Sequence, residues 1–328
     1  MSVVVSLTFS QGRRDKLVSL RNGFTYIANL FTLLVAIAFI LTIDDQILTF
    51  RLLAYTLTFI GLFTSALFIF FVPEVRLTAL AIAYDKAYKK ANGMKDDIKE
   101  ERPSRATISE DVTSWTQWLT NGAFYIHGVV YMFARMAVNV TMTLTPFYLI
   151  HVLDFEQKEN EPVPPEIATV PLASYTMSML FSLFGYGRLV KAFGNRLIPL
   201  LIGVIITCGA SVPFIFMKPS FSWLVYFAAS FQGIGLSIML NIATSLISDV
   251  IGDDDTSSAF VYGTYSLFDK FFSGALLVII GNTVIEDKDW LIWLSSMLPI
   301  IGGIMTYLFA FLGQKLYADK LRGVSIQK

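Results

Sequence analysis

The chain consists of two long apolar segments, a charged stretch of 49 residues, and six more apolar segments. About 20 consecutive apolar residues are long enough to cross the core of a bilayer as a helix. A helix is expected for each segment because an isolated strand would leave its backbone polar groups unpaired in lipid. We predict membrane spans at 24–43, 52–72, 123–152, 168–187, 197–217, 221–247, 259–285 and 290–312. The sequence therefore predicts an all-α polytopic membrane protein.

The composition supports this class and excludes several others. Hydrophobic residues make up 55% of the chain and charged residues 15%, whereas soluble domains carry about 25% charged residues. The formal net charge is zero, so nothing indicates a nucleic-acid partner. The lone cysteine, Cys208, lies in an apolar segment and cannot form a disulfide framework or a cysteine-based metal site. The sequence has no nucleophile motif and no paired His/Glu spacing typical of a metal site. We therefore predict that the protein binds no metal or cofactor and is not an enzyme; a polytopic membrane enzyme is the weakest alternative.

The distribution of Lys and Arg predicts the orientation. If the N-terminus is cytosolic, 19 basic residues outside the spans lie in the cytosol, Arg21 among them, and four lie on the opposite side. Basic residues favour the cytosolic side of a membrane protein. We therefore expect both termini and the segment 73–121 to be cytosolic.

Segment 73–121 contains apolar residues at helical spacing. They are Leu77, Leu80, Ala81, Tyr84 and Tyr88. This pattern is typical of an amphipathic helix at the membrane surface, or of a solvated helix that links two domains. We favour the linker helix and leave the surface helix open.

Arg135 lies in the middle of the third predicted span, where a charge is costly. Tyr131 and Asn139 share its helix face. A guanidinium keeps its proton at any relevant pH, so Arg135 needs a carboxylate, backbone carbonyls, water or an anionic substrate group. We predict a role in substrate binding or coupling; the alternative is a structural contact between helices.

Asp269 and Lys270 are adjacent in the seventh predicted span. Tyr262 and Tyr265 share the helix face of Asp269. Adjacent residues point about 100° apart on a helix, so one can face a cavity while the other pairs with a neighbouring helix. We predict that Asp269 pairs with Arg135 and that all three charged residues face the interior of the bundle. The alternative is that the charges only hold helices together.

Other polar residues in the spans have plainer explanations. His127 and His151, at the two ends of the third span, are predicted to be surface groups. Polar stripes in the fourth and sixth spans, and the pair Gly233 and Gly235, are predicted to pack helices together. The stripes are Ser174, Tyr175, Ser178 and Ser182 in the fourth span, and Asn241, Thr244, Ser245 and Ser248 in the sixth.

Several motifs carry a resemblance to a known family. A glycine-rich basic connection at 185–196 contains Gly185, Arg188, Lys191, Gly194 and Arg196. More specific are Ser-Asp-Val-Ile-Gly at 248–252, Phe-Asp-Lys at 268–270, and the stretches 258–263, 131–139, 20–25 and 28–29. Over about 17–312 the chain resembles the glycoside–pentoside–hexuronide:cation symporter group of the major facilitator superfamily. The resemblance implies that 185–196 is a conformational loop.

The resemblance also implies an architecture. Major facilitator proteins have twelve spans in two six-helix lobes joined by a cytosolic loop, so this chain would hold eight of the twelve. Residues 1–72 would be two spans of the N-terminal lobe, 73–121 the central loop, 122–314 the complete C-terminal lobe, and 315–328 a cytosolic tail. Lys270 matches a lysine that serves substrate binding or coupling in the family.

The resemblance implies symport of a small polar solute with a coupling cation, either a proton or sodium. The expected site residues are Arg135, Asp269, Lys270, Asn139, Tyr131, Tyr262 and Tyr265. The branch of the family that it resembles is associated with cysteine import into lysosomes and melanosomes. This resemblance implies cysteine or cystine as the solute. It also implies a lysosomal or endomembrane location rather than the plasma membrane. The alternatives are a sugar:cation symporter, or a truncated, non-transporting isoform or fragment with a regulatory or assembly role. Such a chain would pair with another membrane chain to cover the exposed face of the lobe.

Overall fold

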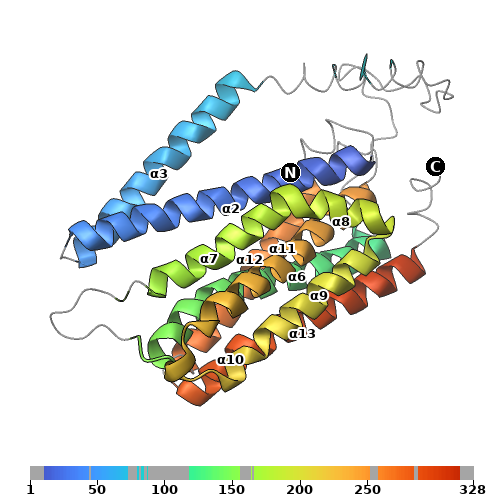
Figure 1. The fold of residues 1–328 in the computed structure, drawn as a ribbon. Coiled ribbons are helices and arrows are strands. Elements are labelled where there is room, and N and C mark those ends of the chain that lie inside the picture. The colour runs from blue at the N-terminus through green and yellow to red at the C-terminus, as the bar shows by residue number, and fades with distance from the viewer. Residues whose placement is uncertain are drawn as a thin grey trace.

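The computed structural model describes residues 11–43, 46–72, 118–155, 164, 166–251, 258–283 and 287–317, with Leu80, Ala83, Tyr84 and Ala87 (Figure 1). Within these residues the fold is helical, and eight helical segments are long and apolar enough to cross a membrane. The elements are α2 Gln11–Thr42, α3 Gln46–Phe71, α6 Gly122–His151, α7 Glu166–Leu180, η1 Phe181–Gly185, α8 Tyr186–Phe193, α9 Leu197–Ser211, α10 Pro213–Phe216, η2 Pro219–Phe221, α11 Leu224–Ile251, α12 Ser258–Thr283 and α13 Lys288–Leu316. The eight predicted spans are confirmed as helices.

Helix α11 lies at the centre of the bundle. It packs against α6, α7 and α9, while α13 packs against α6 and α9, and α12 packs mainly against α6. In the most apolar 18-residue stretch of α11, 78% of the residues are buried, against 22% for α12. Helix α12 therefore lies at the outside of the six-span bundle, with one face on α6 and the other uncovered.

Two glycines let α11 approach its neighbours closely. A Cβ atom at Gly233 would lie 2.5 Å from the backbone oxygen of Ser174 in α7. A Cβ atom at Gly235 would lie 2.7 Å from the backbone oxygen of Gly203 and 2.8 Å from the backbone nitrogen of Thr207 in α9. Small residues at such positions allow van der Waals packing of membrane helices. The predicted packing role of this glycine pair is confirmed.

Gly235→Ala is expected to destabilise the protein by about 1–3 kcal/mol, because the added methyl group meets backbone atoms that cannot move aside. Gly209→Ala is the matched control, since no atom lies within 4 Å of a Cβ atom at that exposed position of α9. Thermal unfolding of the purified variants in detergent would measure the difference. Equal unfolding temperatures for the two variants would contradict the close approach of α9 and α11.

Helix α2 lies along α7, η1 and α11, and α3 leaves its far end and packs mainly against α2 (Figure 1). One face of α2 is buried by these contacts through Asp15, Ser19, Asn22 and Tyr26. The helix begins at Gln11, well before the predicted start of the span at residue 24. Polar side chains that find partners in neighbouring helices allow the helix to continue where hydropathy falls.

The prediction that residues 185–196 form a loop is also wrong in extent. Helix α8 continues to Phe193, and the reversal occurs within Gly194, Asn195 and Arg196. Gly194 takes a left-handed conformation with a φ of 62°, which an L side chain rarely adopts, and so ends the helix. The side-chain oxygen of Asn195 then accepts a hydrogen bond of 2.9 Å from the backbone nitrogen of Leu197. Arg188 and Lys191 are exposed on α8 rather than in a loop.

Three predictions concern residues outside the described part of the chain. These are the helical pattern of segment 73–121, of which only Leu80, Ala83, Tyr84, Ala87 and 118–121 are described, the connection 252–257, and the tail from 318 onward. The division into two remnant spans, a central loop, a six-helix lobe and a tail remains a prediction.

Candidate functional site

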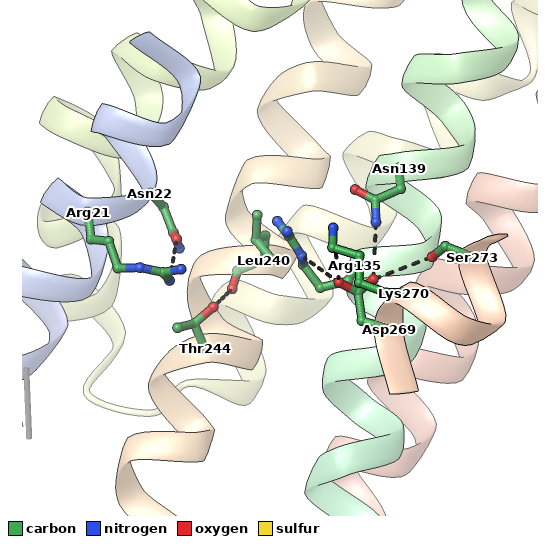
Figure 2. A network of polar contacts seen from close by, with 9 residues as sticks. All are labelled: Arg21, Asn22, Arg135, Asn139, Leu240, Thr244, Asp269, Lys270 and Ser273. Atoms are coloured by element: carbon green, nitrogen blue, oxygen red, sulfur yellow. Dashed lines mark hydrogen bonds and ion pairs between the residues drawn. The ribbon is translucent and has the colours of Figure 1, made fainter. Parts of the chain in front are cut away.

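Asp269 of α12 is the centre of a polar cluster inside the membrane-spanning region (Figure 2). Only 1% of the surface of Asp269 is exposed. Nε of Arg135 lies 3.4 Å from Oδ2 of Asp269, and Nδ2 of Asn139 donates to Oδ1 at 3.1 Å. Oγ of Ser273, one turn along α12, donates to Oδ1 at 3.4 Å. The predicted pairing of Asp269 with Arg135 is confirmed, and it joins α12 to α6.

Lys270 reaches the same carboxylate oxygen as Arg135 (Figure 2). Its Nζ atom lies 3.7 Å from Oδ2 of Asp269, yet its side chain is 65% exposed. The prediction that Lys270 faces the interior of the bundle is therefore wrong. Since adjacent residues point about 100° apart, the face that turns Asp269 toward α6 leaves Lys270 on the uncovered flank of α12.

The three predicted site tyrosines are buried beside this cluster. The hydroxyl of Tyr265 donates to the backbone oxygen of Phe124 at 2.5 Å, and the hydroxyl of Tyr262 lies 2.7 Å from Oγ of Ser248. The rings of Tyr131 and Tyr265 pack with their centroids 6.4 Å apart. Tyr262 and Tyr265 thus already have partners that join α12 to α11 and α6, and a direct site role remains a prediction.

Arg21 and Asn22 of α2 are neighbours of the site that we did not predict. Nδ2 of Asn22 donates to Oδ1 of Asn241 in α11 at 2.8 Å, and Nδ2 of Asn241 donates to Oγ of Ser182 in η1 at 3.0 Å. Ser182 and Ser19 also exchange hydrogen bonds between their hydroxyl and backbone oxygens. The sequence does contain a pattern that predicts a buried polar face on this helix. Its members recur at a spacing of three or four residues, which places them on one helix face: Asp15, Ser19, Asn22 and Tyr26.

Arg21 lies half-buried beside this network, and its Nη1 donates to Oδ1 of Asn22 at 3.3 Å. Its guanidinium extends from α2 in the direction of that of Arg135 in α6, and both helices pack against α11 (Figure 2). Arg135, Tyr131 and Tyr262 are all within electrostatic range of Arg21. We predicted Arg21 to be a cytosolic charge outside the spans, and the structure instead places it on helix α2, half-buried in the bundle.

Arg196 forms a second ion cluster, at the end of the bundle that the charge pattern predicts to be cytosolic. Its Nη2 lies 2.6 Å from Oδ1 of Asp15 in α2, and its Nη1 pairs with Oδ2 of Asp249 in α11. Burial alone would lower the pKa of Arg196, but the carboxylates of Asp249 and Asp15 raise it above its ordinary value. Arg196 therefore stays charged and joins the starts of α2 and α9 to the end of α11.

His127 is the last departure from the sequence predictions. It is 1% exposed, with Nδ1 at 2.9 Å from the backbone oxygen of Ala123, so it is not a surface group. Its ring packs at Gly313 of α13, which has no side chain to fill that space. His151, at the end of α6, is half-buried.

The polar stripes of the fourth and sixth spans do pack helices together, as predicted. The hydroxyl of Ser178 donates to the backbone oxygen of Gly233 at 2.8 Å, and the hydroxyls of Tyr186 and Ser245 lie 3.0 Å apart. No three His, Cys, Asp or Glu side chains in the described residues are grouped closely enough to hold a metal ion.

A helical membrane bundle with a buried, ion-paired carboxylate between its spans is typical of membrane transporters. The sequence matches the Major Facilitator Superfamily over residues 1–268. The chain belongs to this superfamily, whose members are transporters, and it is an integral, multi-pass membrane protein.

Similar proteins include three named Major facilitator superfamily domain-containing protein 12. The protein from Mus musculus is 26% identical over 298 residues, which cover 86% of this chain and 58% of that protein. Those from Homo sapiens and Equus caballus are each 30% identical over 168 residues, covering 51% of this chain and 33% of theirs. The chain thus spans less than two thirds of the length of the relatives that it matches.

Proposed function

We propose that the chain is part of a secondary active transporter that carries a small polar solute together with a cation. The observation that carries this proposal is Asp269, a buried carboxylate in a membrane-spanning helix that contacts Arg135, Lys270 and Asn139. Ionisable groups within membrane spans are costly and usually mark substrate or ion pathways. In such folds the site lies near the midplane, where two repeats meet.

Asp269 suits a coupling role because two cations share its carboxylate. A proton that binds to Asp269 would remove the negative charge that holds Arg135 and Lys270, and a sodium ion on its oxygens would compete with them. Arg135 cannot lose its own proton, so once released it requires another anionic or hydrogen-bonding partner. We propose that the solute supplies this partner, which links cation binding to solute binding.

Cysteine or cystine is the solute we propose, with import into a lysosome-related organelle, on the basis of the motif resemblance. A sugar carried with a cation is the alternative solute. Uptake of labelled cysteine, cystine and melibiose into proteoliposomes, each with and without proton and sodium gradients, separates these possibilities. Uptake that does not respond to either gradient would contradict coupled transport.

Lys270→Ala is expected to reduce uptake by at least about tenfold, which corresponds to about 1.4 kcal/mol, while expression stays near that of the unmodified protein. Lys270 contributes little to packing because its side chain is 65% exposed. Lys218→Ala, an exposed position before η2, is the matched control. Normal uptake by Lys270→Ala would remove Lys270 from the site.

The uncovered flank of α12 favours a second candidate function, a regulatory or assembly role without transport. Lys270, Phe271 and Leu267 are exposed on this helix. We propose that another membrane chain covers the flank in this case, because an exposed ammonium group facing lipid is costly. Saturable, gradient-driven uptake by the purified 328-residue chain alone would reject this second candidate.

A further inference from the structure

We propose that Arg21 of α2 and Arg135 of α6 together form a binding site for a carboxylate group of the transported solute, beside α11, against which both helices pack. The proposal deepens the transport function above and rests on it. It concerns residues from two parts of the chain that are far apart in sequence. Arg21 precedes the charged segment 73–121, and Arg135 follows it.

The side chains around Arg21 and Arg135 carry more positive than negative charge. Arg21, Arg135 and Lys270 bring three positive charges, and Asp269 brings the one carboxylate that pairs with any of them in the described part of the chain. Arg21 has a single hydrogen-bond acceptor there, the neutral side chain of Asn22. The cluster therefore carries an excess of two positive charges within the membrane-spanning region.

The orientation of the two guanidinium groups supports the same site. They extend toward one another from α2 and α6 (Figure 2), and each lies within electrostatic range of the other. Like charges held together in a partly desolvated setting repel each other, and an anion between them removes that repulsion. The Asn22–Asn241 hydrogen bond of 2.8 Å fixes the adjacent turn of α2, so Arg21 cannot simply move away with its helix.

The free donors of the pair indicate which anion fits. Arg135 contacts Asp269 through Nε at 3.4 Å, which leaves its two terminal nitrogens available as far as the described residues go, and Arg21 uses Nη1 for Asn22. Planar guanidinium groups bind the two oxygens of a carboxylate in a bidentate manner. Asp269 lies beside the site and would repel a doubly charged phosphate more strongly than a singly charged carboxylate. The buried tyrosines Tyr131 and Tyr262 lie within electrostatic range of Arg21 and carry hydroxyl groups.

The site would also be sensitive to the position of α2. Because Arg21 belongs to α2 and Arg135 to the six-span bundle, a carboxylate held by both joins the two parts. An uncharged solute lacks this connection and leaves the two arginines to repel each other. The carboxylate would thus favour the arrangement in which Arg21 lies close to Arg135.

The test measures binding separately from transport. Thermal unfolding of the purified chain in detergent is followed with acetate, alanine and glucuronate, each beside its amide, which lacks the carboxylate charge, and with inorganic phosphate. A carboxylate present at about ten times its Kd should raise the unfolding temperature by about 2 °C, and its amide should not. Arg21→Gln and Arg135→Gln should each lose this response. Arg51→Gln, an exposed arginine of α3, is the matched control and should keep it.

Arg135→Lys serves as the second variant, since it keeps the charge but loses the bidentate geometry, and it should weaken carboxylate binding at least about tenfold. Carboxylate-specific stabilisation without any uptake would support this site and count against the transport function. Uptake that does not distinguish a carboxylate from its amide, or stabilisation by phosphate alone, would overturn the site and leave transport standing. No stabilisation by any carboxylate would also overturn it.

Discussion

Replacing Asp269 with alanine is expected to abolish uptake and to destabilise the protein by about 3–5 kcal/mol. Asp269 is buried and is the one carboxylate that contacts Arg135 and Lys270 within the described residues. Its removal leaves the guanidinium of Arg135, whose side chain is only 20% exposed, without a negative partner. An unpaired charge in that position costs far more than the loss of one hydrogen bond.

Chemical unfolding in detergent and uptake into proteoliposomes would measure the two effects. Ser273→Ala is the control, because it removes only the 3.4 Å hydrogen bond to Asp269 and should cost about 1 kcal/mol or less. The double variant Asp269→Asn with Arg135→Gln removes both charges and should recover most of the stability but no uptake. If the double variant transported normally, the ion pair would be structural, and our coupling proposal would be wrong.

Arg196→Gln is expected to have the second large effect, a loss of about 3–5 kcal/mol together with loosening of α2. Arg196 lies between Asp15 and Asp249, which are both buried for the most part, and it pairs with both. Without the guanidinium the two carboxylates would remain close together at the junction of α2, α9 and α11. Like charges in such a place repel each other and favour separation of the helices that carry them.

Hydrogen exchange of the α2 amides would detect this loosening directly, since local opening exposes backbone amides that are otherwise protected. Arg51→Gln, in the exposed part of α3, controls for the loss of an arginine and should leave the exchange of α2 unchanged. The triple variant that adds Asp15→Asn and Asp249→Asn should recover protection, because no charge remains to be paired. Unchanged exchange in Arg196→Gln would show that the cluster does not hold α2 in place.

The Arg196 ion cluster and the asparagine pair both act on α2. Asp15 contacts Arg196 near the start of α2, and Asn22 contacts Asn241 two turns further along. Both contacts use polar groups that are buried, so each is costly to break without a replacement partner. We expect that a movement of α2 relative to the six-span bundle must break both together.

The sequence by itself determined the eight spans, because the length and hydropathy needed to cross a bilayer are properties of each segment alone. It also determined the pairing of Asp269 with Arg135. Two opposite charges in separate spans have few other partners in a membrane, so the cost of burial selects the pair. The packing role of Gly233 and Gly235 could be predicted for a similar reason, since glycines within an apolar helix are suited to close helix contacts.

Only the tertiary structure decided which neighbours each polar side chain meets. From its sequence context, Arg21 was predicted to be a charge outside the spans. Hydropathy cannot show that Asp15 and Asn22, on the same helix, pair with residues at the start of α9 and in α11. Lys270 and Asp269 are adjacent in sequence, yet the contact of α12 with α6 buries one and exposes the other. These outcomes depend on which helices pack together, and that packing arises from contacts between residues far apart in the chain.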